Sequence, residues 1–256
     1  MRKTLYGLLV FGMCLVTLGS GALAQSTSET PKILFEKEEI KDQKSLFERA
    51  SKGITDLEKK PFSSVAELEN TKTKVKEKVK TYTTTQRIKV EKHPDGSVKE
   101  SFVTTSFALI PTNKSNINES VTTEGYNGSG SLYNSGTDPS ISVKAYSTIY
   151  WDNWYDPNNN LYYDLTKVTG GWEPQDSYIQ ISNRYINLSA IGWAYGVGRV
   201  NQGLQVHASI NTFSVTAPSE WYPIHAKDTY RTFGSHQKCT ISDSSDTWTF
   251  DFYNYK

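Results

Sequence analysis

The sequence predicts an α+β protein in which a charged helical segment and a β-hairpin precede an antiparallel β-sandwich. From Gln25 to Ile110 the chain holds 17 Lys or Arg and 14 Asp or Glu residues, whereas from Pro111 to Lys256 it holds 9 and 13. The first stretch contains 6 aromatic residues and the second contains 24. After residue 138, short alternating runs are separated by turn residues without a long amphipathic helix, which is typical of an antiparallel sheet.

The first residues, MRKTLYGLLVFGMCLVTLGSGALAQS, have the order of a secretory signal. Arg2 and Lys3 precede an apolar run, and Ala22-Leu23-Ala24 fits a signal peptidase site. We therefore expect residues 1–24 to be removed and the protein to be secreted, extracellular or cell-wall associated. An uncleaved anchor is the alternative, although the apolar run is shorter than a stable transmembrane span of about 20 residues requires. No later stretch is apolar enough to span a membrane.

After the signal the chain holds one cysteine, Cys239, so an internal disulfide is not expected. The protein must then be stabilised by its hydrophobic core, and the chain is long enough to form one. Cys239 shares one face of a candidate strand, HQKCTIS, with Ile241. This predicts a buried, inert thiol, with a reactive or intermolecular thiol as the alternative.

Residues 25–80 form the charged helical segment, which could be a stalk, a propeptide or an addition packed on the sheet. Its apolar residues recur at helical spacing, which predicts an amphipathic helix of about five turns that ends at Lys60-Pro61. Those residues are Ile40, Phe47, Ala50, Ile54 and Leu57. Ser64 followed by Glu67 is a capping-box pattern, so a second helix is expected to begin there.

The segment TKTKVKEKVK, residues 71–80, carries a lysine at every second position: Lys72, Lys74, Lys76, Lys78 and Lys80. A strand would place all five on one face, and a helix would spread them around its circumference. One interpretation is attraction to an anionic surface such as teichoic acid or phospholipid headgroups. The alternative is a solvated face with no ligand.

Residues 81–111 give the clearest hairpin, because two alternating β-branched runs flank the turn His93-Pro94-Asp95-Gly96. Residues 112–137 are rich in Asn, Ser, Gly and Thr, which predicts a linker or loop. Residues 138–256 form the expected antiparallel β-sandwich. Its candidate strands are Ile141–Trp151, Tyr178–Ser182, Tyr185–Leu188, Leu204–Ala208, Phe213–Thr216 and Trp248–Phe252.

The stretch YWDNWYDPNNNLYYD, residues 150–164, reads as a hairpin with its tip at residues 156–160. Its start matches a calcium loop, but Leu161 and Lys167 occupy the positions that need glycine and glutamate. A looser calcium site would need Asp152, Asp156 and Asp164. The carboxylates of Asp152, Asp164, Glu173 and Asp176 could also serve a glycosidase, but nothing marks one pair.

The same stretch could supply a ligand-binding platform, because exposed aromatic rings stack on sugar faces and nearby Asp and Asn side chains bond to hydroxyls. The candidate contacts are Tyr146, Tyr150, Trp154 and Tyr155. The alternative is that these rings pack against a second sheet or the N-terminal helix.

The four histidines, at positions 93, 207, 225 and 236, do not show the spacing of a zinc site. A pairing of Cys239 with His225 or His236 has no supporting motif, and the motifs of serine hydrolases, metalloproteases and nucleotide-binding enzymes are missing from the sequence. We therefore predict no catalytic residues, no metal and no cofactor. We expect no nucleic acid partner, because the protein is expected to be secreted and its net charge is only +1.

Three stretches of the second half resemble secreted proteins from spore-forming Gram-positive bacteria that have no assigned activity: SGTDPSISVKAYSTIYW, DLTKVTGGWEPQDSYIQISNRYINLSAIGW and TWTFDFYNY. The resemblance covers about residues 125–256 and implies export and a β-rich domain. It carries no active-site residues.

Together, these patterns predict a secreted non-enzymatic protein that associates with cell-envelope or polysaccharide material, such as cell-wall glycan or teichoic acid. The alternatives are a secreted antibacterial or membrane-active β-protein, and a hydrolase whose site is not recognisable.

Overall fold

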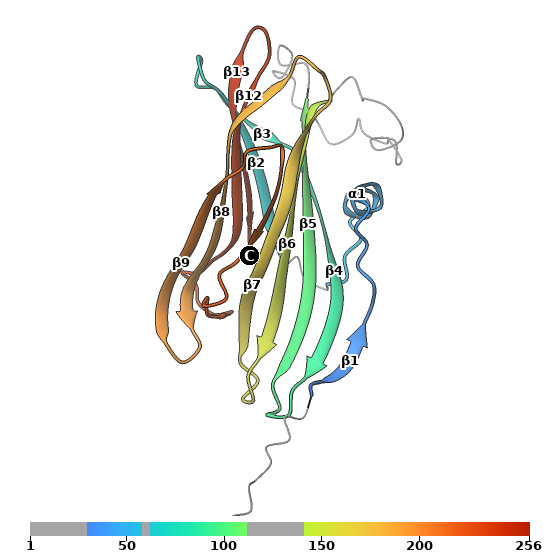
Figure 1. Ribbon diagram of the computed structural model, residues 1–256, viewed down its shortest axis with the longest axis vertical. Coiled ribbons are helices and arrows are strands. Elements are labelled where there is room, and N and C mark those ends of the chain that lie inside the picture. Colours follow the sequence, from blue (N-terminus) through green and yellow to red (C-terminus); the bar gives the residue numbers. More distant parts are fainter. Residues whose placement is uncertain (1–29, 58–61, 112–140) are drawn as a thin grey trace, which may run out of the picture.

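In the computed structural model, which describes residues 30–57, 62–111 and 141–256, antiparallel strands form most of the protein (Figure 1). A single short helix, α1 (Gln43–Ser51), is present among the described residues. The strands are β1 (Lys32–Glu36), β2 (Ser63–Asn70), β3 (Lys76–Val79), β4 (Thr81–Lys92), β5 (Val98–Pro111), β6 (Ile141–Tyr155), β7 (Leu161–Pro174), β8 (Gln180–Ala194), β9 (Gly198–His207), β10 (Thr212–Thr216), β11 (Ile224–His225), β12 (Thr232–Ser242) and β13 (Thr247–Tyr255).

The strands belong to one hydrogen-bonded sheet, in the order β1-β4-β5-β6-β7-β11-β8-β12-β13-β2-β3. Strand β10 pairs with β7, and β9 pairs with β8. Strands β4 and β5 form the hairpin expected over residues 81–111. The strands of residues 138–256 are joined at both ends by strands of the first half, since β6 pairs with β5 and β13 pairs with β2.

The two ends of the strand order approach each other around Ser64 of β2. Its hydroxyl lies 2.9 Å from the hydroxyl of Thr83 on β4 and 2.6 Å from the Oδ1 of Asn254 on β13. In the core, Phe62 lies 5.6 Å from the Trp151 ring, and Phe233 lies 6.5 Å from it. Strands that are distant in the order therefore share one hydrophobic core.

Helix α1 is shorter than the sequence predicted. Asp42 caps its N-terminus by accepting a hydrogen bond of 2.8 Å from the amide of Ser45. Phe47 packs edge-on against Phe107 of β5, with ring centres 5.4 Å apart. The helix ends at Ser51, because Gly53 adopts a positive φ of 67° and reverses the chain. The expected extension of the helix to Lys60-Pro61 was therefore wrong.

The second expected helix was also wrong, because residues 63–70 form strand β2. Ala66 and Leu68 are buried while Val65 is exposed, so the segment follows a period of two. All eight residues pair with β13, and tertiary pairing overrides the local capping pattern. Of the predicted charged helical segment, residues 25–80, the described part thus contains one helix and three strands.

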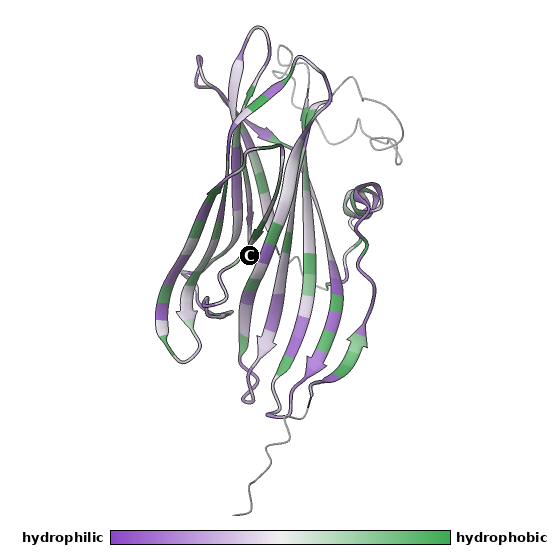
Figure 2. Cartoon of the chain, in the orientation of Figure 1, coloured by the Kyte–Doolittle hydropathy of each residue, from purple (hydrophilic) through white to green (hydrophobic). Residues whose placement is uncertain are grey.

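In strand β6 the apolar residues that enter the core lie an even number of positions apart, as the sequence predicted. Val143, Ala145, Ile149 and Trp151 are all buried in the core. Hydrophobic and hydrophilic residues are interspersed along the strands (Figure 2), as expected where one face of a sheet is buried and the other is more polar. The turn to β7 lies at residues 156–160, as predicted, and the Asp156 amide donates to the Asn160 carbonyl.

Cys239 lies on β12 and is buried, and burial raises the pKa of its thiol, as expected for an inert cysteine. The described residues form no helix long and apolar enough to span a bilayer. The predicted signal, residues 1–24, and the predicted linker, residues 112–137, lie outside the described residues.

Candidate functional site

The structure does not bring the four predicted aromatic contacts together on one surface. Successive residues along a strand point to opposite faces. Trp154 therefore lies on one side of β6, and Tyr155 lines a cavity on the other side. Tyr146 and Tyr150 lie further along the strand, beside the segment that contains α1.

Tyr146 and Tyr150 are engaged by the N-terminal segment. Tyr146 packs against the hydrophobic cluster of α1, which includes Leu46 and Phe47. The Tyr150 hydroxyl donates a hydrogen bond of 2.9 Å to the carboxylate of Glu39. Burial, followed by the Glu39 carboxylate, raises the pKa of Tyr150 to about 12. Both rings thus contact the N-terminal segment, and both also line a small pocket of about 230 Å³ beside it.

Trp154 helps to form an outer pocket of about 240 Å³. The pocket is lined by Lys99, Asp152, Trp154, Asp164, Tyr195, Tyr222 and Pro223. The Tyr195 ring lies 4.6 Å from the Trp154 ring at 87°, so the two rings meet edge to face. Tyr195 and Tyr222 are both exposed, at 45% and 46%, so this pocket is open to a ligand that arrives from solvent.

Charged groups lie beside these rings. Asp152 on β6 and Asp164 on β7 are paired directly across the two strands. The ammonium group of Lys99 lies 2.9 Å from the Asp152 carboxylate. Burial raises the pKa of Asp164 to about 6, and the Asp152 carboxylate acts in the same direction. The pocket therefore combines aromatic surface with groups that can donate and accept hydrogen bonds.

This carboxylate pair lacks a feature that glycosidase chemistry requires. Both carboxylates of such an enzyme must reach the substrate, one as the acid and the other as the nucleophile or base. Asp152 is buried and held by Lys99, so it does not present a free carboxylate to the pocket.

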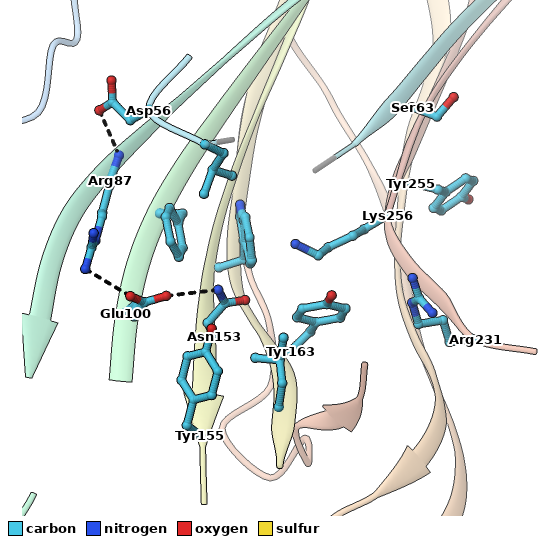
Figure 3. A pocket seen from close by; sticks show the side chains of 14 residues that line it. Asp56, Ser63, Arg87, Glu100, Asn153, Tyr155, Tyr163, Arg231, Tyr255 and Lys256 are labelled. Carbon is cyan, nitrogen blue, oxygen red and sulfur yellow. Dashed lines mark hydrogen bonds and ion pairs between the residues drawn. The ribbon is translucent and has the colours of Figure 1, made fainter. Parts of the chain in front are cut away.

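Tyr155 lines a larger inner cavity of about 810 Å³ (Figure 3). Its aromatic lining includes Phe102 and Trp151, which are stacked with ring centres 4.7 Å apart. Tyr163 stands edge-on to Trp151, with ring centres 6.0 Å apart. Volumes of 300–1,000 Å³ are usual for small-molecule sites.

Polar groups converge on the same cavity from several strands. Arg87 of β4 donates to one oxygen of Glu100 at 3.0 Å, and Asn153 of β6 donates to the other at 3.1 Å (Figure 3). The Lys256 ammonium group lies 3.7 Å from the centre of the Trp151 ring. Burial lowers the pKa of Lys256 to about 7, and the positive charge of Arg231 acts in the same direction.

The five lysines of residues 71–80 are all exposed. Lys76 and Lys78 lie in β3, which ends the strand order, and a charged edge strand discourages pairing with another chain. Lys74 and Lys76 both lie within 3.6 Å of the Glu69 carboxylate, which neutralises part of their charge. Strand β3 and the tip of β6 lie toward opposite ends of the molecule (Figure 1). The lysines and Trp154 do not share one surface.

Asp156, the first residue of the calcium-like pattern, acts in the turn. One of its carboxylate oxygens accepts hydrogen bonds from the amides of Asn158 and Asn160, at 2.9 and 2.8 Å. No group of three or more His, Cys, Asp or Glu side chains among the described residues is arranged to hold a metal ion. His236 bonds to Asp251 at 2.7 Å and stacks on Tyr253, which is a structural arrangement.

Sequence reasoning did not identify several residues that complete the two pockets: Lys99, Tyr195, Tyr222, Arg231 and Lys256. Local patterns give little signal for them, because each comes from a strand or loop distant in sequence from residues 150–164. Their place depends on which strands are neighbours.

No family model, curated protein or solved structure matches the chain.

Proposed function

We propose that this is a secreted, non-enzymatic protein that associates with cell-envelope or polysaccharide material through an aromatic face of its β-sandwich. The proposal rests on one observation: Trp154, Tyr195 and Tyr222 line the outer pocket together with Lys99, Asp152 and Asp164. Aromatic side chains supply large, rigid contact area with little conformational freedom to lose, and the adjacent charged groups can bond to hydroxyls.

The outer pocket is the better candidate for a polymer because its aromatic rings are accessible from solvent. A polymer needs a site that remains open along the chain of sugars, and two of the three rings here are exposed. The inner cavity has its aromatic floor on Trp151 and Phe102, which are only 1% and 2% exposed. The exposed lysines would assist electrostatically from another part of the molecule and would not contact the same sugars.

The test is sedimentation of the chain from Gln25 to Lys256 with purified Gram-positive cell walls, with and without teichoic acid. Trp154→Ala and Tyr222→Ala should each weaken binding about tenfold, because each removes one stacking surface. Tyr178→Ala is the matched control, because Tyr178 is an exposed tyrosine that does not line the outer pocket. It lies before the start of β8, whereas Tyr195 of the pocket lies after the end of this strand.

The outcomes separate the two parts of the proposal. Binding that persists without teichoic acid and falls in Trp154→Ala supports recognition of a glycan. Binding that disappears without teichoic acid and is unchanged in Trp154→Ala assigns the attraction to the lysines. If both pocket variants sediment as well as the unaltered protein, the outer pocket is not the binding site.

A second candidate, a membrane-active protein, is favoured by the turn that joins β8 and β9. Trp193 near the end of β8 and Tyr195 and Val197 in the turn are exposed, and Trp and Tyr are suited to membrane–water interfaces. Flotation with liposomes and release of a trapped dye test this function. Release that is reduced in Trp193→Ala would support it, and an absence of both flotation and release would reject it.

A further inference from the structure

The inner cavity lies on the opposite side of β6 from the Trp154 pocket. The two share no lining residue: the inner cavity is lined by Trp151, Asn153 and Tyr155 of β6, and the outer pocket by Asp152 and Trp154. Whatever the inner cavity binds is therefore distinct from the material contacted by Trp154.

The acidic side chains that line this cavity are already neutralised. Glu100 is paired with Arg87 at 3.0 Å. Asp56 forms ion pairs with Lys37 and with Arg49. Both acidic lining residues, Asp56 and Glu100, are therefore already paired. Their carboxylates do not balance further positive charge inside the cavity.

Two cations in the same lining have no such partner among the described residues. Within the described part of the chain, neither Arg231 nor Lys256 forms an ion pair with a carboxylate. Arg231 donates two hydrogen bonds to backbone carbonyls, and its guanidinium lies 5.6 Å from the centre of the Tyr163 ring. Lys256 lies 4.1 Å from the same ring, so both cations flank one aromatic side chain. The positive charge of Arg231 acts on Lys256, and an anion between the two would remove that repulsion.

The cavity also holds a buried acceptor without a partner. The Oδ1 of Asn153 makes no hydrogen bond among the described residues, and this side chain is only 8% exposed. Its amide nitrogen is held by Glu100, so the oxygen is left pointing toward the side where Tyr163 and Lys256 lie (Figure 3). A buried acceptor is costly unless a donor such as a ligand hydroxyl reaches it.

We propose that the inner cavity binds a small acidic sugar, whose carboxylate or phosphate lies between Arg231 and Lys256 and whose ring lies against the side chains of Tyr155 and Tyr163. A hydroxyl of the sugar donates to Asn153. The volume of about 810 Å³ accommodates one or two sugar rings. In this arrangement Lys256 moves from the face of Trp151 toward the anion.

The test is titration of the chain from Gln25 to Lys256 with four probes, with binding measured by calorimetry and by tryptophan fluorescence. The probes are glucuronic acid, glucose 6-phosphate, neutral glucose and inorganic phosphate. Both acidic sugars, or the one whose acid group fits, should bind at least tenfold more tightly than glucose and than phosphate alone. If glucose binds as tightly as the acidic sugars, or if neither acidic sugar binds at millimolar concentration, the proposal is wrong.

Variants separate charge from packing. Lys256→Met and Arg231→Met should each weaken binding of the acidic sugar at least tenfold, whereas Lys256→Arg should retain most of it because it keeps the charge. Thermal unfolding confirms that each variant is folded. Trp154→Ala should bind the acidic sugar normally, so failure here and failure of the wall-binding proposal can be told apart. Equal binding by Lys256→Met and the unaltered protein would reject the proposed site.

Binding of glucuronic acid should also weaken between pH 6 and pH 9, because Lys256 loses its proton in this range and Arg231 does not. Besides Arg231, the other ionisable groups that line the cavity with Lys256 are Arg87 on β4, Glu100 on β5, Tyr155 on β6, Tyr163 on β7, Tyr255 on β13 and Asp56 after α1. Burial raises the pKa of all three tyrosines, so they stay neutral throughout. In Lys256→Arg the pH dependence of glucuronic acid binding should disappear. If it persists in this variant, the pH dependence does not arise from Lys256.

Discussion

Asp152 and Asp164 lie directly opposite each other on β6 and β7, and a single lysine, Lys99, contacts the Asp152 carboxylate at 2.9 Å. Two carboxylates held this close cannot both ionise easily. Burial raises the pKa of Asp164, and the Asp152 carboxylate acts in the same direction. The pocket beside Trp154 therefore changes charge through Asp164 near pH 6.

The first prediction concerns Asp164→Asn. Because the folded pKa of Asp164 is raised to about 6 from its ordinary value of 3.8, the folded protein binds this proton more tightly than the unfolded chain does. The resulting stability is full below pH 4 and is lost as the pH rises through 6. Relative to the unaltered protein, Asp164→Asn should gain about 1–2 kcal/mol between pH 4 and pH 7, after allowing for partial solvation.

Urea unfolding at both pH values measures this difference. Asp176→Asn is a control outside the pocket, and it should show no comparable gain. A stability difference between Asp164→Asn and the unaltered protein that is the same at pH 4 and pH 7 would contradict the raised pKa.

The second prediction concerns the stability contribution of Lys256. Its pKa is lowered in the folded protein from the ordinary value of 10.5 to about 7, so the unfolded chain binds this proton more tightly. Stability should therefore rise with pH above 7, and Lys256→Met should lack this rise, which we expect to be about 1 kcal/mol between pH 7 and pH 9. Guanidinium unfolding across this range measures it, and Lys78→Met, on the exposed β3 edge, should behave as the unaltered protein does.

The third prediction concerns the attachment of α1 to the sheet. Phe47 is buried between the rings of Phe107 and Tyr82, at 5.4 and 5.3 Å. Phe47→Ala leaves a cavity there and should destabilise the protein by about 3–4 kcal/mol. Ile54→Ala, at a position that is 44% exposed, should cost less than about 1 kcal/mol. Denaturant unfolding compares the two, and equal losses would show that α1 does not pack as described.

The fourth prediction compares two glycines with positive φ. Gly234 has a φ of 141°, and a Cβ there would collide with the backbone of Asn254 on β13. Gly96 has a φ of 89° in an open turn with no atom near the added carbon. Gly96→Ala should therefore cost about 1 kcal/mol through backbone strain alone, and Gly234→Ala should cost at least about 3 kcal/mol.

Thermal unfolding of the two variants distinguishes strain from collision. A Gly234→Ala protein as stable as Gly96→Ala would mean that β12 and β13 approach each other less closely at this point.

The sequence predicted those features that depend on neighbouring residues. The alternation of Val143, Ala145, Ile149 and Trp151 identified the buried face of β6, because side-chain direction along a strand has a period of two. Turn residues located the hairpins at Gly96 and at residues 156–160 for the same reason, since backbone preferences at a turn are local.

The predictions failed where a distant partner decides the outcome. Residues 63–70 have a local pattern that fits a helix cap, yet β13 recruits them as a strand from the far end of the chain. Tyr146 and Trp154 are similar as sequence positions on β6. One is covered by α1 and the other lines an open pocket, because different elements pack beside them.

By itself, then, the sequence determined a β-rich chain, the positions of most strands and the aromatic character of the second half. Only the tertiary structure decided the strand order, the separation of the predicted platform into two pockets, and the meeting of Lys256 with Trp151. The physical reason is that periodicity records which face of an element is apolar. It does not record which other element covers that face, because many pairings bury similar areas and the choice depends on the whole packed core.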